Sequence, residues 1–254
     1  MQGETYLAAG VDRQAAQRAK ESIKALASAT LQPEVLGGVG FFGGMYQLQG
    51  YRQPVLVSST DSVGTKTKIA SLMGRLDTLG IDLVNHCIND IFTCGARPLF
   101  FLDYIAMCRL VPESAVALVK GVAQACRATG CSLIGGETAE LPGTYPEGEF
   151  DLVGFIVGVV ERRAIIDGSA IRRGDVLLGL PSSGLHTNGY SLVRRVFGLD
   201  GRPAAQWDHY HREMGQTLGE ALLQVHRCYL PSLRPVLPLV KGLAHITGGG
   251  LPGN

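Results

Sequence analysis

Apolar segments typical of strands alternate with amphipathic segments typical of helices through the first part of this chain. Predicted strands lie at 54–59, 98–107 and 150–161, and predicted helices at 80–94 and 113–129. In the first of these helices, apolar residues recur at the three- and four-residue spacing of one helix face. Elements that alternate in this way pack in layers, so the sequence predicts an α/β fold built of α+β layers.

Further elements extend the pattern toward both ends of the chain. A helix is predicted at 12–30 with Asp12 as its N-cap, another at 65–75, and a short strand at 132–134. Beyond Asp167-Gly168 the sequence predicts a strand at 174–181, a helix from about Tyr190 and a helix near 213–229.

The length allows one large domain or two modest ones, because the chain has 254 residues, of which 46% are hydrophobic. The boundary signal near Asp167-Gly168 favours two. We therefore expect an N-terminal domain at 1–168 and a second domain at 169–254.

The composition argues against several classes of protein. The formal net charge is +1 and basic runs are short, so a nucleic-acid-binding surface is not indicated. Six cysteines occur without a Cys-x-x-Cys pair, a pattern that fits buried thiols in a reducing cytosol. The longest apolar run, 152–160, is too short to span a bilayer, and the N-terminus has no secretory pattern. We expect a cytoplasmic protein that binds neither nucleic acid nor membrane.

The segment Asp61-Ser-Val-Gly-Thr-Lys-Thr-Lys68 gathers polar groups where a predicted strand runs into a helix start. Asp61 offers a hard oxygen ligand for Mg²⁺. Gly64 lets the backbone approach an anion, the helix N-terminus offers free N–H donors, and Lys66 and Lys68 add positive charge. The pattern predicts a joint site for a metal ion and phosphates. The structural alternative is a polar turn that caps an ordinary helix.

Two more carboxylates are candidates for the same metal ion. Asp90 follows Asn89 at the edge of an otherwise apolar helix, where a plain helix end does not explain an acid. Asp61 and Asp90 together make a reasonable pair for a divalent cation. Glu137 follows a glycine pair and is a better ligand candidate than Glu140, which can equally be a surface or dimer-contact residue.

The segment Ser183-Gly-Leu-His-Thr-Asn-Gly189 concentrates polar and glycine positions in one loop after a predicted strand. A single histidine is usually structural, but the hydroxyl and amide neighbours favour a site role for His186. His186 can hydrogen-bond a phosphate or serve as an acid or base. The Gly-rich segment 37–44 matches neither a P-loop nor a Rossmann turn, so it is either a mobile cover for an anion or a plain connector.

The ordered set of motifs resembles the phosphoribosylformylglycinamidine cyclo-ligase family, also called aminoimidazole ribonucleotide synthetases. The resemblance runs from Tyr6 to the last residues. The matching segments are the Gly-rich loop, 59–66, Asn89-Asp90 with Gly95-Ala-x-Pro98, Phe100-Phe-Leu-Asp-Tyr104, 135–143, 184–191 and His245-Ile-Thr-Gly-Gly-Gly250. So many matches in order are far more specific than any single motif.

The resemblance implies an enzyme of purine biosynthesis that closes the imidazole ring of formylglycinamidine ribonucleotide. ATP would phosphorylate the formyl amide oxygen, the amidine nitrogen would attack that carbon, and phosphate would depart. Positioning and charge neutralisation supply most of the catalysis in such phosphoryl transfers. The implied cofactors are ATP and Mg²⁺, and the implied partner is a small-molecule ribonucleotide.

The resemblance also implies roles for the candidate residues. The metal ligands would be the carboxylates Asp61, Asp90 and Glu137. ATP and its phosphates would contact Asp61, Gly64, Thr65, Lys66, Asn89, Asp90, Gly135 and Gly136. The substrate would face Ser183, His186, Thr187 and Asn188, with His186 as the candidate for assisting the chemistry.

The family fold implies an N-terminal α/β domain that pairs with its twin to form a barrel across a homodimer. A C-terminal α/β domain follows, and the active site lies between the two. This sequence departs from the family in two ways: Ser62 stands at a usual glycine position, and the family continues beyond the last segment of this chain. We therefore expect the C-terminal domain to be incomplete.

Two alternatives to an active cyclo-ligase follow from these departures and from the superfamily. The first is a catalytically incompetent dimeric fragment of such an enzyme. The second is a sister ATP-dependent kinase or synthetase. The sister enzymes are disfavoured because the first cysteine is Cys87, the last residue is Asn254, and Asp61 stands without an adjacent Asp.

Overall fold

A four-stranded sheet forms the centre of the protein in this computed structural model, which describes residues 13–201, 207 and 209–254. Its strands are β3 (Pro54–Ser62), β4 (Arg97–Met107), β5 (Ser132–Glu140) and β6 (Phe150–Glu161). The strand order is β3-β6-β4-β5, with β6 antiparallel to both neighbours and β4 parallel to β5. A helical crossover joins the parallel pair, as such a pair requires.

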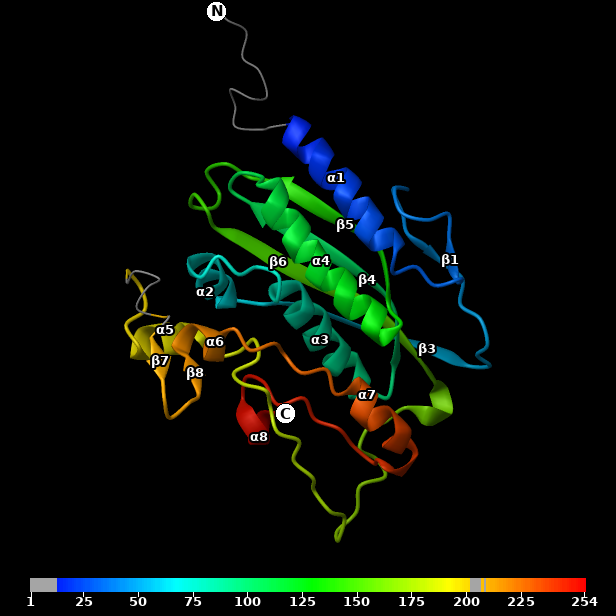
Figure 1. The fold of residues 1–254 in the computed structure, drawn as a ribbon. Coiled ribbons are helices and arrows are strands. Elements are labelled where there is room, and N and C mark those ends of the chain that lie inside the picture. Colours follow the sequence, from blue (N-terminus) through cyan, green and yellow to red (C-terminus); the bar gives the residue numbers. More distant parts are fainter. Residues whose placement is uncertain (1–12, 202–206, 208) are drawn as a thin grey trace, which may run out of the picture.

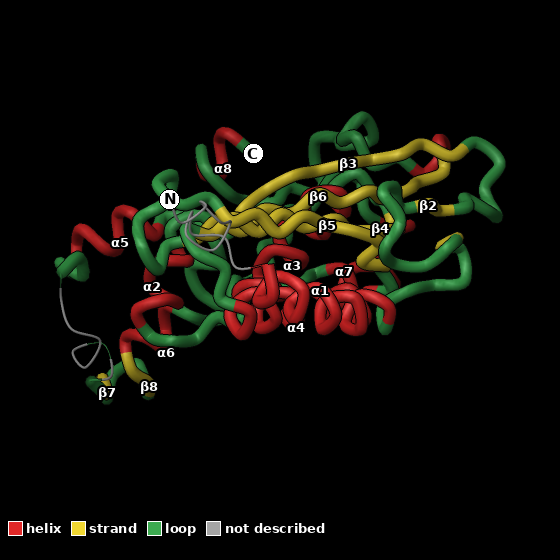
Figure 2. The backbone as a smooth tube through the Cα atoms, turned by 90° about the horizontal axis from the view of Figure 1, so that it is seen from above, coloured by secondary structure: helices red, strands yellow, loops and turns green. Residues whose placement is uncertain are grey.

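Three long helices lie on one side of this sheet (Figures 1 and 2). They are α1 (Arg13–Ser28), α3 (Leu79–Phe92) and α4 (Pro112–Thr129). The apolar core lies between them and the sheet, and it includes Leu83 and Leu118 from the helices and Phe101 from β4. The mixed α/β class predicted from the sequence is confirmed.

Two glycines allow α3 and α4 to pack at close range. A Cβ atom at Gly80 would lie 2.2 Å from the Leu118 carbonyl oxygen, and one at Gly121 would lie 2.6 Å from the Asp77 carbonyl oxygen. Side chains do not fit at such distances, so glycine at both positions lets the two backbones touch. This contact fixes the position of α3, which carries most of the site described below.

The other face of the sheet leaves large apolar side chains exposed. Leu56 is 62% exposed, Phe155 is 40% exposed and Tyr104 is 37% exposed. Phe155 of β6 lies opposite Thr60 on one side and Leu102 on the other, so it sits in the middle of this face. We call this surface the open sheet face.

The smaller N-terminal elements complete this region. The strands β1 (Val35–Leu36) and β2 (Met45–Tyr46) pair around the Gly-rich segment 37–44, and α2 (Lys66–Leu72) follows β3. The helices and long strands predicted up to residue 161 are confirmed with small shifts of their bounds, whereas the short strand predicted at 132–134 continues to residue 140. Asp12, the predicted N-cap, lies outside the described residues.

The C-terminal region contains short elements (Figure 1). They are α5 (Tyr190–Val196), β7 (Tyr210–His211), β8 (Gln216–Thr217), α6 (Leu218–Leu222), α7 (Leu230–Leu233), the 3-10 helix η3 (Arg234–Leu239) and α8 (Gly250–Gly253). The helix predicted from Tyr190 is confirmed. Among the described residues, no helix is long and apolar enough to cross a membrane.

Two elements predicted in the C-terminal region are wrong. The segment 174–181 forms no strand, and its apolar residues Val176, Leu177 and Leu178 are 82%, 93% and 82% exposed. A strand needs a neighbour to bond with, and this segment has none among the described strands. The helix predicted near 213–229 is reduced to α6, which starts at a capping box formed by Thr217 and Glu220.

Candidate active site

One face of α3 is polar although the helix is buried. The polar side chains recur at the spacing of a single helix face and are Asp82, Asn85, His86, Asn89 and Asp90. Asp82 is fully buried, and Asn85, His86 and Asn89 are less than a tenth exposed. Buried polar groups need hydrogen-bond partners, and the C-terminal region supplies them.

The segment 224–229 runs along this polar face and is held by side chains of α3. Asp82, Asn85 and Asn89 make hydrogen bonds of 2.7 to 3.0 Å with backbone groups of His226, Arg227 and Tyr229. These bonds satisfy the backbone without a helix, which explains why the predicted helix ends near residue 222. Asn89 was predicted to contact ATP, but its buried amide is engaged in these bonds.

Lys66 was predicted to meet phosphates, but the structure places it in the interior. Its side chain is fully buried, and Nζ lies 2.7 Å from Asp82 Oδ2 and donates to the Gln224 carbonyl at 2.8 Å. Burial raises the pKa of Asp82 to about 6 and lowers the pKa of Lys66, while the two charges oppose these shifts. In this arrangement Lys66 holds the two regions together and is inaccessible to a ligand.

Asp61 lies near the end of β3 and is paired with an imidazole. Its Oδ2 atom lies 2.7 Å from His86 Nε2, and the Ser62 backbone N–H donates to its Oδ1 at 2.7 Å. Burial acts to raise the pKa of Asp61, but the hydrogen bond and charge of His86 outweigh it and lower the pKa. His86 Nδ1 lies 2.6 Å from Thr187 Oγ1, so His86 connects Asp61 to the predicted loop 183–189.

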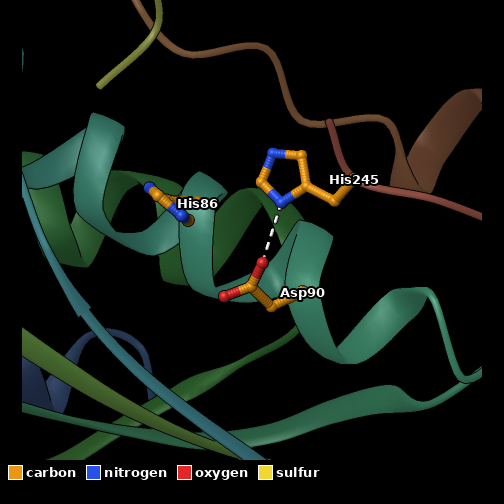
Figure 3. A group of neighbouring side chains, drawn as sticks. All are labelled: His86, Asp90 and His245. Carbon is orange, nitrogen blue, oxygen red and sulfur yellow. Dashed lines mark hydrogen bonds and ion pairs between the residues drawn. The ribbon is translucent and has the colours of Figure 1, made fainter. Parts of the chain in front are cut away.

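Asp90 lies one helical turn after His86 and is paired with His245 (Figure 3). Its Oδ1 atom lies 2.8 Å from His245 Nδ1, and Ser59 Oγ donates to its Oδ2 at 2.8 Å. Burial acts to raise the pKa of Asp90, but the hydrogen bonds from His245 and Ser59 lower it. Asp61 and Asp90, predicted as a pair, thus both lie beside His86.

His186 has an unusual backbone and an uncharged ring. Its φ is +57°, and it is the one non-glycine residue with positive φ in the described part of the chain. The ring stacks on His226 at 4.1 Å, and its Nε2 atom accepts a hydrogen bond from the Ser183 N–H at 3.1 Å. Burial, followed by the positive charge of His245, lowers the pKa of His186 to about 4. His186 is therefore neutral at pH 7.

The turn between β3 and α2 belongs to the segment 61–68 that was predicted to bind phosphates, and it lies at the surface. Gly64 is exposed with φ +54°, and Thr65 Oγ1 lies 3.2 Å from Ser191 Oγ. Ser62 Oγ accepts the Gly64 N–H at 3.2 Å, so this side chain braces the turn. Asn188, predicted to face the substrate, is exposed as well.

The residues predicted on β5 lie apart from this site. The sheet register runs from Asp61 across β6 and β4 to Gly136, which puts them about 14 Å apart at the usual strand spacing. A Cβ atom at Gly136 would lie 2.2 Å from Asp103 Oδ1, so a packing requirement explains this glycine. Within one chain, Glu137 is not brought to Asp61 and Asp90, and its metal role stays a prediction.

Three histidines of the site were not predicted as functional residues. His86 and His226 were missed entirely, and His245 was noted only as part of a matching segment. The available signal was the polar stripe of α3, whose spacing shows that Asp82, His86 and Asp90 share one face. The sequence carries no comparable signal for His226, because its place depends on a segment that has no regular structure.

Known proteins with this fold define the class. Residues 45–160 match the family model of the AIR synthase related protein N-terminal domain, and residues 172–254 match that of the C-terminal domain. Among solved structures, HypE from E. coli aligns with a TM-score of 0.58 and 18% identity, covering 92% of this chain and 66% of HypE. That likeness concerns the fold alone. Fold and family models together define an AIR synthase related protein.

Similar proteins with assigned names show which family within this class the chain belongs to. Phosphoribosylformylglycinamidine cyclo-ligases from Desulfitobacterium hafniense (strain DSM 10664 / DCB-2) and Myxococcus xanthus are 53% and 54% identical, each over 99% of this chain and 74% of the relative. The relative from Geobacillus kaustophilus is 54% identical over 97% of this chain and 72% of its own length. This chain belongs to the phosphoribosylformylglycinamidine cyclo-ligase family. The predicted ligase of purine biosynthesis is thereby confirmed over the incompetent-fragment and sister-enzyme alternatives.

Proposed function

We propose that the chain catalyses the ATP-dependent cyclisation of formylglycinamidine ribonucleotide to aminoimidazole ribonucleotide, with release of ADP and phosphate. The observation that carries the proposal is a convergence of groups in a chain of this family. The carboxylates of Asp61 and Asp90, the neutral ring of His186 and the hydroxyl of Thr187 lie around His86 and His226. Such a site can hold a cation that neutralises phosphate charge, and it can accept a proton.

The reaction needs one phosphoryl transfer and one ring closure. In the first step the formyl amide oxygen forms a bond to the γ-phosphorus of ATP, the bond from that phosphorus to ADP breaks, and the amide nitrogen loses its proton to form a C=N bond. In the second step the amidine nitrogen forms a C–N bond, the C–O bond to phosphate breaks, and the nitrogen loses a proton. The protein's part is to hold the reacting groups in line and to take up that proton.

His186 is suited to receive the proton. A neutral imidazole can accept a proton at pH 7, and the pKa of about 4 keeps His186 neutral before substrate binds. Phosphate groups bound beside it would raise its pKa and so favour proton uptake during ring closure. Ser183 orients the ring through its backbone N–H, and Thr187 and Asn188 on the same loop would contact the substrate.

The two carboxylates also fit Mg²⁺, which takes oxygen ligands. The Asp61 side chain is 38% exposed and that of Asp90 is 28% exposed, so both can reach an ion shared with bound ATP. The ion would neutralise charge on the phosphates. Glu137 is a further proposed ligand, and Gly64, Thr65, Gly135 and Gly136 are proposed contacts of ATP.

Turnover measured with ATP and formylglycinamidine ribonucleotide, with phosphate release followed in parallel, tests the proposal. We expect Asp61→Asn to weaken Mg²⁺–ATP binding in calorimetry while the fold stays intact. The matched control is Asp77→Asn, which changes an exposed carboxylate outside the site. Unchanged nucleotide affinity in Asp61→Asn would remove Asp61 from the metal site, and absence of turnover in the folded protein would contradict the proposed reaction.

His186→Ala tests the proton acceptor separately from nucleotide binding. We expect turnover to fall by about 10²–10⁴-fold, the usual contribution of a general base, with a much smaller change in ATP affinity. His211→Ala is the control because His211 is exposed on β7. Full activity in His186→Ala would exclude His186 from the chemistry.

A homodimer through the open sheet face is part of the proposal. The exposed apolar side chains Leu56, Tyr104 and Phe155 favour a second layer packed on this face, and a twin sheet would close a barrel. We expect Phe155→Asp to convert a dimer into a monomer in light scattering, whereas Leu178→Asp, also an exposed apolar position, leaves the mass unchanged. A dimer that survives Phe155→Asp would place the interface elsewhere.

The remaining parts of the proposal concern organisation. Residues 1–168 would form the domain for ATP binding and dimerisation, and residues 169–254 a second domain that covers the site. The expected incompleteness of this second domain stays a prediction. We further propose that the protein acts in the cytoplasm, where ATP and ribonucleotides are available.

A further inference from the structure

The candidate site holds an unusual concentration of imidazole groups. Four of the six histidines in the chain gather there: His86, His186, His226 and His245. Neighbouring rings lie 4.1 to 5.4 Å apart between centroids. Phosphate binding and proton transfer require one such ring, so the others need a separate explanation.

Three of the side chains are arranged like ligands of one metal ion. His86 and Asp90 lie four residues apart on α3, so both project from the same face of a rigid helix. His245 comes from the C-terminal region and closes the group (Figure 3). One ligand atom from each residue lies within 4.8 Å of the other two. We call these three residues the histidine–aspartate cluster.

The surroundings of the cluster match those of metal ligands in proteins. A ligating histidine usually bonds an oxygen through its second ring nitrogen, and a ligating carboxylate is itself hydrogen-bonded. His86 Nδ1 lies 2.6 Å from Thr187 Oγ1, which leaves Nε2 as the ligand atom. Asp90 Oδ2 accepts a hydrogen bond from Ser59 Oγ at 2.8 Å. Both ligands are therefore oriented before any ion binds.

The donor set selects the kind of ion. Mg²⁺ prefers a shell made of oxygen atoms, whereas two imidazole nitrogens and one carboxylate suit Zn²⁺ and its first-row neighbours. Three protein ligands leave one tetrahedral position open. A water molecule would complete the shell, because Asp61, although its Oδ2 lies 2.7 Å from His86 Nε2, is not part of this group of mutually close ligand atoms. The cluster is thus chemically distinct from a plain Mg²⁺–phosphate site although it shares Asp90 with one.

From this arrangement we infer that His86, Asp90 and His245 form a binding site for a transition-metal ion of the Zn²⁺ class. The ion lies between the side chains where Asp90 now bonds to His245 and takes the place of these direct contacts. Because Asp90 is shared, the bound ion competes with the Mg²⁺ that the proposed function places there. Zn²⁺ therefore inhibits turnover, and ATP with Mg²⁺ weakens Zn²⁺ binding. Only this last pair of effects rests on the proposed function.

The test uses Co²⁺ as a spectroscopic substitute for Zn²⁺ on the full chain after chelator treatment and without nucleotide. We expect visible d–d absorption typical of a four-coordinate nitrogen–oxygen site, saturating at one Co²⁺ per chain and reversed by Zn²⁺ but not by Mg²⁺. We expect His245→Gln to lower the Zn²⁺ affinity by at least about tenfold. Changing a residue that only hydrogen-bonds a ligand already costs about 10- to 100-fold in metal affinity. His86→Gln should do the same.

Two controls separate the cluster from other metal-binding groups. His209 and His211 lie close together on the surface, with ring centroids 5.3 Å apart, so His209→Gln combined with His211→Gln removes a competing surface pair. A cobalt–thiolate charge-transfer band would reveal binding by one of the free cysteines. We expect neither the surface double variant nor thiol blocking to change the signal.

The outcomes decide the inference without reference to catalysis. Absence of Co²⁺ and Zn²⁺ binding, a signal unchanged in His245→Gln, or a signal lost in the surface double variant would each overturn it. A protein that binds Co²⁺ as described but shows no turnover would support the site and contradict the proposed reaction. A protein that catalyses the reaction but does not bind Co²⁺ would support the proposed reaction and contradict the metal site.

Discussion

The two regions of this chain are held in shape by different forces. Residues 54–161 form a sheet and helices around a continuous apolar core, in which side chains such as Leu83 and Phe101 are fully buried. Residues 172–254 have short elements, and several of their apolar side chains, including Leu177 and Leu239, are more than four-fifths exposed. The second region takes much of its conformation from polar side chains of the first.

The difference shows where the site gets its geometry. The polar face of α3 supplies hydrogen bonds to the segment 224–229, and Lys66 supplies a buried ion pair and a bond to Gln224. The helix itself is fixed by apolar packing and by the glycine contact with α4. A rigid element therefore positions a less regular one, which is how loops acquire precise functional groups.

The largest expected effect follows from breaking the buried Lys66–Asp82 ion pair of the first region, whose two members also bond to the second region. Asp82→Ala leaves the buried Lys66 ammonium with the Gln224 carbonyl but without a counter-charge, and it removes the acceptor of the His226 N–H. We expect a loss of about 3–5 kcal/mol in the free energy of unfolding, the usual cost of removing one partner of a buried pair. Denaturant-induced unfolding measures it.

A double variant distinguishes the charge from the hydrogen bond. Lys66→Met combined with Asp82→Ala removes both charges, so most of the stability lost in Asp82→Ala should return. Recovery should be incomplete because the His226 N–H still lacks its acceptor. If Asp82→Ala alone unfolds at the wild-type midpoint, the two regions are not held together by this pair.

The next prediction compares how a Leu→Ala substitution changes the free energy of unfolding in each of the two regions. Leu83→Ala removes a fully buried side chain from the core, and we expect it to cost about 2–5 kcal/mol. Leu177→Ala removes a side chain that is 93% exposed, and it should change stability by less than about 0.5 kcal/mol. Similar losses in both variants would mean that 174–181 is buried in solution and that the contrast between the regions is wrong.

The same contrast explains what could be predicted from the sequence. In the N-terminal region, helix and strand periodicity arises from burial on one side, so 80–94 and 98–107 were predicted close to their observed bounds. In the C-terminal region the apolar run at 174–181 has the composition of a strand but no neighbour to pair with. The helix predicted at 213–229 ends early because its backbone bonds to α3, and a linear sequence does not show that partner.

The site was predictable in part for the same reason. Asp61, Asp90 and His186 stand out because polar residues next to apolar elements have a local signature. Lys66 has the same signature, yet it faces the interior, since the first turn of α2 directs it toward Asp82. His226 has no local signature at all. Its role depends on contacts between residues far apart in the chain, which only the fold reveals.

The smallest expected effect is a difference in pH dependence between the regions. Burial raises the pKa of Asp103 in β4 to about 7, so the folded state holds a proton that the unfolded chain releases above about pH 4. The stabilisation from this protonation is complete below pH 4 and is lost as the pH rises through about 7. Asp103→Asn should make the stability of the sheet less dependent on pH across this window.

The titration of His186 is expected to change stability with pH in the opposite direction to that of Asp103. Burial lowers its pKa to about 4, below the ordinary value of 6.5, so between these values the unfolded chain binds more protons than the folded one. Its contribution to stability is therefore complete above about pH 6.5 and is lost as the pH falls toward 4. Lowering the pH from 8 to 5 should favour the sheet through Asp103 while it loosens the loop 183–189. NMR titration of the His186 ring, together with hydrogen exchange in both regions, measures the two trends. A His186 midpoint near 6.5 would mean that the ring is solvated, and that the C-terminal region covers the site less closely than the sheet covers its core.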